Sequence, residues 1–536
     1  MFSSRLQVIR RFVSYSTKVS GNGSYSRWTS TRVVLFSSAI ATFTYFIGAS
    51  NVRSELGMTL STLPLPRKDH VYGGRRELVR AMKELVLVLG KEGVSDDEED
   101  LERHGLNEWS CVDVDTFPAL IVYPRSTQDV AAIAKISHKY RVPVVAYAGG
   151  TSLEGHFAST PAGICCDFTL MDGIIAVRED DLDCTVQCGV NYLELNKTLK
   201  EKGLFFPPDP APTARIGGMI GTGCSGTNAS RYGTMKDWVL NLTVVLADGT
   251  IIKTRRRARK SCAGYDLTRL FVGSEGTLGL VTEATLKLTT LPDETVAVCS
   301  FPTIRDAAMA VAKVTRSQVQ CAAVEMMDQA SMKIINHTNA TKRKWEEKPT
   351  LFIKFSGTPG QVAEQISQVR EITNANKGGK FEFASDEEEA LNLWSARKAL
   401  LWSLISMSTT GSEVWTTDIC TPISAMPKVI EECQRDLDAS GFKYGIVSHA
   451  CDGNWHAAIH YNKNNPGERE LVENIVHKMV DRAIDMDGTC TGEHGVGLGK
   501  RGELGQETVD TMRRIKYALD PLGLLNPHKV IPDNYK

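Results

Sequence analysis

The chain has 536 residues, 42% hydrophobic and 23% charged, a composition that excludes a disordered protein and suffices for two or three globular domains. The formal net charge of −1 excludes the strongly basic balance expected of a nucleic-acid-binding protein. Thirteen cysteines form no Cys-x-x-Cys motif, and their odd number excludes a complete set of disulfides within one chain, so we expect mostly free, buried thiols.

The amino end has the composition of a mitochondrial presequence, which we predict over residues 1–32. No acidic residue occurs between Met1 and Arg53, and basic residues are spaced through this stretch. The next segment, Val33–Ala49, is uncharged and apolar, at the short end of the ~17–25 residues needed to span a bilayer. This order resembles the bipartite signals that place proteins in the inner membrane facing the intermembrane space, and we predict that location. A removed sorting signal and a buried helix are the alternatives to a membrane anchor.

Residues 50–114 are predicted to form a linker and N-terminal helices. The linker contains proline, and apolar residues recur at helical spacing over Gly74–Leu89. The acidic run Ser95–Asp100 is expected to be a solvated loop.

From Asp115 onward, short apolar strands alternate with helices, which indicates an α/β or α+β domain. One helix is predicted from an N-cap at Ser126–Thr127 to Tyr140, and another over Asn191–Lys202. The alternation continues beyond Pro292, with helices over Arg305–Ser317 and Gly360–Asn374. The predicted strands are Ala119–Tyr123, Val142–Ala146, Gly163–Cys166, Ile174–Val177, Cys184–Cys188, Leu242–Leu246, Leu280–Leu288, Thr295–Phe301 and Thr350–Phe355.

Three glycine-rich segments interrupt the first of these domains. Ala148–Gly155 follows a predicted strand, without the lysine of a P-loop and without the spacing of a dinucleotide-binding Rossmann turn. Its glycines let backbone N–H groups approach a phosphate, and its hydroxyls can donate to one. Ile216–Gly223 and Gly273–Gly279 repeat the pattern. One such segment is usually a tight turn, but three in one domain favour a bound phosphate group.

A pair of histidines closes a predicted β-hairpin in the carboxyl half. The strand-like segments Phe442–Val447 and Ala457–Tyr461 flank the sequence Asp-Gly-Asn, a hairpin signal that would place His449 and His456 side by side. Two imidazoles with the carboxylate of the later Glu-His pair suit a zinc-like ion with open positions, the arrangement of a catalytic metal site. Ordinary turn or core histidines are the alternative.

Many short motifs stand in a specific order along the chain. They are Pro124-Arg125-Ser126-Thr127, Ala148–Gly155, Pro207-Pro208-Asp209-Pro210, Ile216-Gly217-Gly218, Tyr232-Gly233-Thr234, Leu246–Thr250, Gly273–Gly279, Trp394–Lys398, His449–His456, Gly492–Gly497 and Leu525-Asn526-Pro527. The amino-terminal set resembles FAD domains of the vanillyl-alcohol oxidase/para-cresol methylhydroxylase (PCMH) type. The carboxyl-terminal set resembles the FAD-linked oxidase C-terminal domain of D-lactate and D-2-hydroxy-acid dehydrogenases.

The resemblance implies an α+β fold with two domains. A two-subdomain PCMH-type FAD-binding domain is expected over residues 115–292. A carboxyl-terminal substrate domain is expected over residues 293–536, with an α+β cap built on an antiparallel sheet and a last segment that returns to the flavin.

The resemblance also assigns residues to FAD. In this family the first glycine loop holds the FAD pyrophosphate. Because His156, the only histidine of that loop, lies beyond the motif, we predict non-covalent FAD and expect His156 to be a surface or packing residue. The residues assigned to the pyrophosphate are Gly149, Gly150, Thr151 and Ser152, and those assigned to the rest of the cofactor are Gly217, Gly218, Gly223, Ser274, Glu275 and Thr277.

The resemblance assigns His449, His456 and Glu493 as ligands of a divalent metal, with zinc the expected ion. Arg397 is expected to bind the substrate carboxylate through its planar guanidinium, with a surface salt bridge as the alternative. The metal is expected to acidify the substrate hydroxyl, and His494 to take its proton as general base while hydride moves from C2 to flavin N5.

The implied function is mitochondrial, FAD- and metal-dependent oxidation of D-lactate, or a similar small D-2-hydroxy acid, to pyruvate or its analogue, with electrons passed to cytochrome c. Acidic residues within Asp96–Asp100 or Asp386–Glu389 are expected to steer that basic partner. Ala458 stands where relatives specific for D-2-hydroxyglutarate carry Asn, which favours a short substrate. Cys451 replaces a usual glycine, and we expect it to be inert. A D-2-hydroxyglutarate dehydrogenase, an ether-lipid flavin transferase and a metal-dependent hydrolase are the alternatives.

Overall fold

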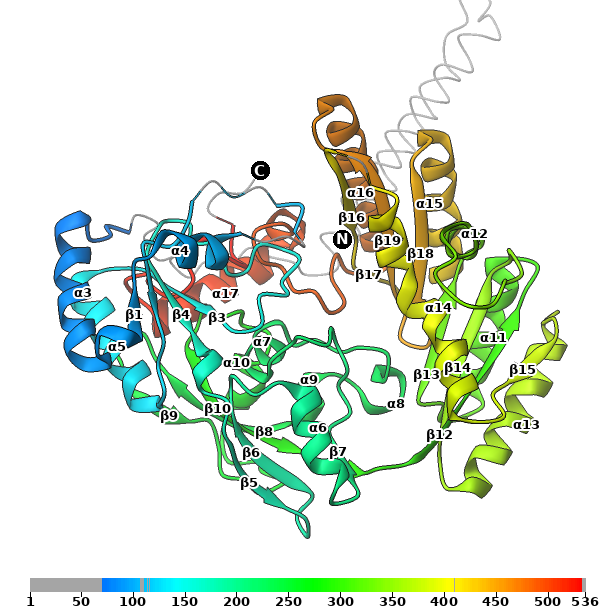
Figure 1. Cartoon of the computed structure of the whole chain (residues 1–536), viewed down its shortest axis with the longest axis horizontal. Helices are drawn as coiled ribbons and strands as arrows, with labels where there is room; N and C mark the ends of the chain where they lie inside the picture. The colour runs from blue at the N-terminus through cyan, green and yellow to red at the C-terminus, as the bar shows by residue number, and fades with distance from the viewer. Residues whose placement is uncertain (1–69, 107–109, 113, 115, 409, 533–536) are drawn as a thin grey trace, which may run out of the picture. The chain divides into compact units, whose positions relative to one another are not determined.

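The computed structural model describes residues 70–532, apart from 107–109, 113, 115 and 409 (Figure 1). The chain divides into two units, Met1–Leu63 and Pro64–Lys536, and all described residues belong to the second. The predicted presequence and the segment Val33–Ala49 lie outside the described residues. Within the described range, no helix is long and apolar enough to cross a bilayer.

A four-stranded sheet in the order β1-β2-β4-β3 forms the first layer of the amino-terminal half, and α3 and α5 supply apolar residues to its core. Helix α5 begins at the predicted N-cap, since the Ser126 hydroxyl accepts the N–H of Asp129 at 3.1 Å and the Asp129 carboxylate accepts the N–H of Ser126 at 3.0 Å. The elements are α3 (Arg75–Leu89), β1 (Val94–Ser95), α4 (Glu98–Gly105), β2 (Leu120–Val122), α5 (Thr127–Tyr140), β3 (Val144–Tyr147) and β4 (Ile164–Asp167).

The acidic run at residues 95–100 is not a simple loop, so that prediction is wrong. Helix α4 begins at Glu98, and the Asp97 side chain accepts the N–H of Asp100 at 3.3 Å as its N-cap. Three acidic residues occupy the first helical turn, where the helix dipole favours negative charge.

A five-stranded antiparallel sheet, in the order β5-β6-β10-β8-β9, forms the second part of this half. Its core joins strands β6, β8 and β10 to α6, α7 and α10. The elements are β5 (Ile174–Arg178), β6 (Asp183–Gln187), α6 (Tyr192–Lys200), β7 (Leu204–Phe205), α7 (Ile216–Thr222), α8 (Ala229–Tyr232), α9 (Met235–Trp238), β8 (Val239–Val245), β9 (Ile251–Lys253), α10 (Leu267–Phe271), β10 (Leu280–Lys287) and β11 (Thr289–Thr290), of which β7 pairs with β11.

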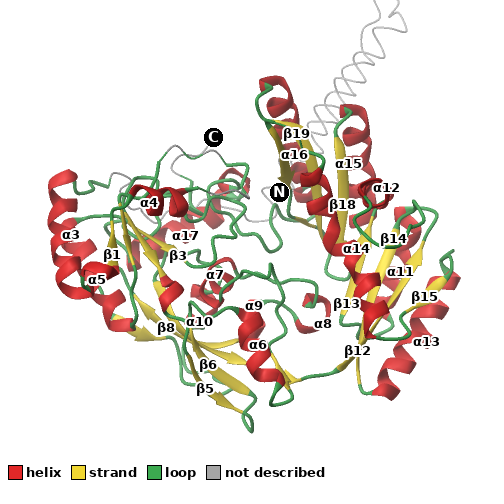
Figure 2. Cartoon of the chain, in the orientation of Figure 1, coloured by secondary structure: helices red, strands yellow, loops and turns green. Residues whose placement is uncertain are grey.

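An eight-stranded antiparallel sheet carries the carboxyl-terminal half, in the order β15-β12-β14-β13-β18-β19-β16, with β17 also paired to β19 (Figure 2). The elements are β12 (Asp293–Ser300), α11 (Ile304–Arg316), β13 (Ala323–Met327), α12 (Gln329–Thr338), β14 (Thr350–Gly357), α13 (Pro359–Ala375), β15 (Phe381–Phe383), α14 (Glu387–Ser406), β16 (Ser412–Thr416), β17 (Ile419–Cys420), α15 (Met426–Ser440), β18 (Lys443–His449), β19 (Asn454–Asn462), α16 (Pro466–Ile484) and α17 (Gln506–Leu519). The α+β class is therefore confirmed.

The two faces of this sheet bury different helices because side chains alternate along each strand. In β12, Ala297 and Cys299 join the core that includes α11, α13, α15 and α16, whereas Val296 and Val298 join the core that includes α12 and α14. The three site residues Glu325, His449 and His456 face α14 as well. Their neighbours two positions along the same strands belong to the α14 core, and these are Met327, Val447 and Ala458.

The end of the described chain returns to the first sheet. Leu525 forms a parallel bridge with Val144, and the N–H of Asn526 donates to the carbonyl of Val144 at 2.8 Å. The last segment therefore meets the strand that leads into the first glycine loop.

Candidate active site

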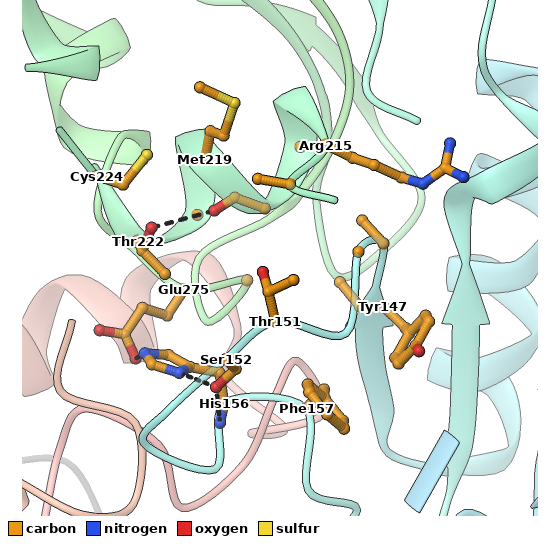
Figure 3. A pocket seen from close by; sticks show the side chains of 18 of the residues that line it. Tyr147, Thr151, Ser152, His156, Phe157, Arg215, Met219, Thr222, Cys224 and Glu275 are labelled. Atoms are coloured by element: carbon orange, nitrogen blue, oxygen red, sulfur yellow. Dashed lines mark hydrogen bonds and ion pairs between the residues drawn. The ribbon is translucent and has the colours of Figure 1, made fainter. Parts of the chain in front are cut away.

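The three glycine-rich segments line one cavity, which Figure 3 shows from close by. Thr151 and Ser152 come from the loop after β3, and Met219 and Thr222 come from α7. Eight of the ten residues assigned to the cofactor line this cavity, and these are Gly149, Gly150, Thr151, Ser152, Gly217, Gly218, Ser274 and Glu275.

The first glycine loop offers backbone donors to the cavity. Among the described residues, no hydrogen bond is made by the backbone N–H groups of Gly149, Gly150, Thr151 or Ser152. Gly150 has φ +63°, and a Cβ there would collide with the Tyr147 hydroxyl. The loop therefore requires glycine and leaves N–H groups for an anionic ligand.

Two of the assigned residues do not line the cavity. Gly223 ends α7 in the left-handed conformation, with φ +67°, and packs against Gly273. Thr277 is buried and donates its hydroxyl to the carbonyl of Ser274 at 2.7 Å. Both residues shape the backbone of the glycine segments.

His156 is predicted from the sequence to be a surface or packing residue. It is not on the surface, so that part of the prediction is wrong. It is buried and lines the cavity, with Nδ1 in contact with the Ser152 hydroxyl and Nε2 3.2 Å from the Glu275 carboxylate (Figure 3). Glu275 in turn accepts the N–H groups of Val496 and Gly497 at 2.7 and 2.8 Å. This carboxylate therefore ties the third glycine segment to the Gly-Glu-His-Gly loop of the carboxyl-terminal half.

The three predicted metal ligands meet at the edge of the same cavity. Nε2 of His449 lies 3.1 Å from Oε1 of Glu493, and Nε2 of His456 lies 3.3 Å from the same oxygen. The hairpin is confirmed, since β18 and β19 pair across it and the two imidazole centroids are 5.4 Å apart. Glu493 also lines the cavity, so the cluster adjoins the space between the glycine loops.

Hydrogen bonds on the outer ring nitrogens fix which nitrogens point into the cluster. Nδ1 of His449 donates to the Glu325 carboxylate at 2.7 Å, and Nδ1 of His456 donates to the carbonyl of Thr417 at 3.0 Å. Both Nε2 atoms are therefore the inward ones, as metal-ligating histidines require.

Electrostatic effects in the cluster are strong. Burial alone would raise the pKa of Glu493, but His449 and His456 hold it well below its usual range. Burial alone would lower the pKa of His449, but Glu325 and Glu493 raise it well above its usual value. The cluster thus gathers negative charge around its imidazoles, the environment that a divalent cation favours.

His494 lies next to this cluster and lines the cavity. Its ring stacks on that of His456, with centroids 4.9 Å apart and planes 12° apart. Burial lowers the pKa of His494 to about 4, although Asp418 acts in the opposite direction. Its Nδ1 atom is buried and has no hydrogen-bond partner among the described residues. The imidazole is therefore neutral near pH 7.

Arg397 reaches the cluster through an acidic residue that the sequence did not single out. Its Nε donates to Oε2 of Glu325 at 2.7 Å, and the other oxygen of Glu325 accepts from His449. Arg397 does not line the cavity, but its side chain is only partly exposed and is joined to His449 through Glu325.

Among the described residues, the two departures from the family pattern, Cys451 and Ala458, contact groups other than His449, His456 and Glu493. The Cys451 thiol contacts the Thr315 hydroxyl at 3.6 Å, and burial raises its pKa to about 11. Among the described residues, the clusters with metal-ligand geometry do not include this thiol. Ala458 is buried in the apolar core beside Trp394 and Ala396.

Several site residues escaped sequence reasoning because their contacts are long-range. Glu325 is the only acidic residue in the apolar strand β13, and Asp418 is the only one between β16 and β17. An acidic residue among apolar ones can indicate a buried functional carboxylate, but the sequence does not show its partner. Ser225 donates to Glu493 at 2.6 Å, and Lys500 forms a buried ion pair with Glu154 at 2.7 Å. No local pattern marks either pair.

Two protein-family models match most of the described chain. The description "FAD binding domain" applies to residues 118–255, and "FAD linked oxidases, C-terminal domain" applies to residues 290–530. The chain is 44% identical over 504 residues to the mitochondrial D-lactate dehydrogenase (cytochrome) of Kluyveromyces lactis, covering 91% of this chain and 87% of that protein. Identity to the corresponding Arabidopsis thaliana protein is 41%, over 94% of this chain and 91% of the relative.

Solved structures agree on the fold. The structure of p-cresol methylhydroxylase with substrate bound aligns with a TM-score of 0.69 at 16% identity, covering 88% of this chain and all of that one (100%). An alkyldihydroxyacetonephosphate synthase aligns with a TM-score of 0.67 at 19% identity, covering 89% of this chain and 92% of that one. At these identities the likeness shows the fold alone, and it confirms the PCMH-type prediction.

Proposed function

The chain belongs to the family of mitochondrial D-lactate dehydrogenases (cytochrome), flavin-dependent oxidoreductases, and from that premise we propose that it oxidises D-lactate to pyruvate with FAD and a divalent metal and passes the electrons to cytochrome c. The observation that carries the proposal is the convergence of the glycine-loop cavity with the cluster of His449, His456 and Glu493. The family excludes the metal-dependent hydrolase, because such an enzyme would have no use for an FAD-binding domain.

The cavity residues fit FAD. The N–H groups of Gly149–Ser152 are available for the pyrophosphate, and the second and third residues of α7, Gly217 and Gly218, have no side chains. A Cβ at Gly218 would meet nothing within 4 Å, whereas one at Gly217 would lie 2.9 Å from Cys188, so Gly218 borders open space and Gly217 allows close packing. When bound, FAD supplies the acceptor for the hydride that leaves the substrate. We propose that it is bound non-covalently.

The histidine and glutamate cluster fits a divalent metal. Two inward Nε2 atoms and a carboxylate oxygen lie within 4.8 Å of one another, a nitrogen and oxygen donor set that suits zinc and leaves open positions. A divalent ion bound there would lower the pKa of a hydroxyl that it contacts. The ligand loop is fixed in advance, because Ser225 holds the second oxygen of Glu493.

The protein's own groups then provide the remaining chemistry. Among the described residues, the Nη atoms of Arg397 make no hydrogen bond, so both can bind a substrate carboxylate. His494 lines the cavity and its low pKa keeps it neutral, so we propose that it accepts the proton of the substrate hydroxyl. Residues such as Phe168, Met219 and Phe271 line the cavity and keep it apolar.

A short substrate is favoured over D-2-hydroxyglutarate. Ala458 lies on the same strand and face as His456, within an apolar core that contains Trp394 and Ala396. A second carboxylate placed there would be buried without a partner, which is unfavourable. We propose that this apolar surface at Ala458 restricts the substrate to small D-2-hydroxy acids.

Two acidic surfaces remain candidates for docking a basic cytochrome c, but the first no longer includes Asp100. At the first run, Asp96–Glu99 are exposed, but the carboxylate of Asp100 is occupied by Arg103 and the Tyr123 hydroxyl. At the second, Asp386–Glu388 are exposed at the start of α14. We propose that the enzyme meets cytochrome c in the mitochondrion, at the inner membrane facing the intermembrane space, and that Val33–Ala49 anchors it or directs its sorting. Charge reversal at both runs should weaken the salt dependence of cytochrome c reduction.

An anaerobic visible spectrum of the purified protein tests the function. D-Lactate should bleach the oxidised flavin rapidly, whereas L-lactate and D-2-hydroxyglutarate should not. Removal of the metal by a chelator should abolish bleaching while the flavin stays bound, and added zinc should restore it. Bleaching by D-2-hydroxyglutarate alone would favour the nearest alternative, and bleaching that survives metal removal would contradict the role of the cluster.

A further inference from the structure

One buried carboxylate joins the two halves of the substrate site. Glu325 is fully buried in the middle of β13, surrounded by Val324 and Met326 on the same strand. Its Oε1 lies 2.7 Å from Nδ1 of His449, and its Oε2 lies 2.7 Å from Nε of Arg397. Each oxygen thus accepts one charge-assisted hydrogen bond, and neither donor has another partner among the described residues at that nitrogen.

The fold places this carboxylate by register. Strands β13 and β18 are antiparallel neighbours in which Glu325 pairs directly with His449. Side chains of directly opposed residues lie on one face of a sheet and touch. Helix α14 covers that face and brings Arg397 to the other oxygen. The three residues therefore come from separate segments, and Glu325 contacts both of the others.

We propose that Glu325 is a positioning residue that sets the tautomer of His449 and the place of Arg397 together. By accepting from Nδ1, it leaves Nε2 of His449 for the metal. By accepting from Nε, it directs the Nη atoms of Arg397 to the substrate carboxylate and fixes their separation from the metal. The inference rests on the proposed function, because it concerns the residue that contacts both a proposed metal ligand and the proposed binder of the substrate carboxylate.

The geometry gives a sharp expectation for Glu325→Gln. An amide has one acceptor oxygen and one donor nitrogen, so it cannot accept from both partners. Because the guanidinium of Arg397 is always charged, it should donate to the amide oxygen. The amide NH₂ group would then face His449. The imidazole would then accept at Nδ1 and carry its proton on Nε2, the nitrogen that the metal needs. Metal affinity should fall by about 10- to 100-fold, as for other partners of metal-bound histidines.

A second substitution should reverse this loss. In Arg397→Met combined with Glu325→Gln, the guanidinium is gone and the amide oxygen is free to accept from His449. Metal affinity of the double variant should return to within a few-fold of Arg397→Met alone. If the two substitutions only damaged the structure, their losses of metal affinity would add in the double variant. The proposed competition for the amide oxygen predicts that metal affinity recovers instead.

The measurement is zinc affinity by competition with a colorimetric chelator, with flavin absorbance as the check that each variant is folded. Asp328→Asn is the matched control, because Asp328 is a buried carboxylate at the end of β13 that binds Ser331 and Gln434 instead of the metal cluster. It should leave zinc affinity unchanged. If Glu325→Gln does not retain flavin, Glu325→Asp is measured in its place; its shorter side chain cannot reach both donors, so the same loss is expected.

The outcomes separate the inference from the proposed function. A wild-type protein that binds no zinc would overturn both. Wild-type binding together with an unchanged affinity in the Glu325 variant, or with no recovery in the double variant, would overturn the inference alone.

Discussion

The carboxylate of Asp418 accepts the backbone N–H of His494 at 2.8 Å. The same oxygen accepts hydrogen bonds from three further donors. The other three donors are the N–H groups of Gly492 and Glu493 and the hydroxyl of Thr491, at 2.8, 2.9 and 2.6 Å. Asp418 is fully buried, and burial alone would raise its pKa, but His494, Lys500 and His456 hold it far below its usual value. A buried anion therefore fixes the loop that carries both a proposed metal ligand and the proposed base.

Replacement of Asp418 by alanine should dismantle this loop. Four donors would lose their acceptor, and the expected loss of stability is on the order of 3 kcal/mol. The kcat for D-lactate should fall more than tenfold, because Glu493 and His494 would no longer be held in place. Urea unfolding and steady-state kinetics measure the two effects. Asp266→Ala is the control: it removes the exposed N-cap of α10, should cost about 1 kcal/mol, and should leave kcat unchanged.

The neutral state of His494 should give the metal-free protein a specific pH dependence. Its folded pKa of about 4 lies below the roughly 6.5 of an unfolded histidine. The unfolded chain therefore binds the extra proton between these values, so the stability is fully present above about pH 6.5 and is lost as pH falls toward 4. Relative to His494→Asn, the wild type should lose up to about 3 kcal/mol over this window. Equal pH slopes in urea unfolding would contradict this assignment.

His494→Asn should also report on catalysis in the loaded enzyme. Loss of a general base typically lowers kcat by about 10²- to 10⁴-fold. Flavin and zinc content should stay near wild-type values, because His494 is expected to touch the substrate and not to hold either group. A kcat within a few-fold of wild type would exclude His494 as the base.

Gly150→Ala should weaken FAD binding at least tenfold. The position has φ +63°, and the new Cβ would displace Tyr147 and the N–H groups beside it. Gly203→Ala is a matched control, since Gly203 has φ +66° but open space around its Cβ, and it does not line the cavity. Both should lose similar stability from backbone strain. Only Gly150→Ala should lower the ratio of flavin to protein absorbance in the purified sample.

Cys451 should behave as an inert, partly buried thiol. Because burial raises its pKa to about 11, it stays protonated at neutral pH and should neither bind zinc nor react. Cys451→Ser should keep zinc affinity within about twofold of wild type. Of the thirteen cysteines, all within the described residues, Cys262 is the exposed one and should account for the single thiol that a thiol reagent titrates rapidly. A tenfold loss of zinc affinity in Cys451→Ser would show that the thiol is a ligand.

Local sequence predicted most elements and one half of the site. The Ser126 cap gave the start of α5, and the Asp-Gly-Asn bend gave the hairpin that brings His449 beside His456. Each depends on a few neighbouring residues, whose backbone preferences and side-chain alternation are strong. Local sequence gave a wrong prediction at Ser95–Asp100. Its acidic residues suggested a loop, but they cap and stabilise the first turn of α4.

The sequence by itself determined the glycine loops, the histidine pair and the order of motifs, because these are set by residues that lie close together in the chain. Only the tertiary structure decided that Glu325 binds both His449 and Arg397, and that Asp418 holds the loop of His494. Those contacts join residues that are 72 to 124 positions apart. The order of strands in a sheet and the helix that covers its face are set by burial over the whole domain, so no local pattern can specify which distant carboxylate will orient a given imidazole.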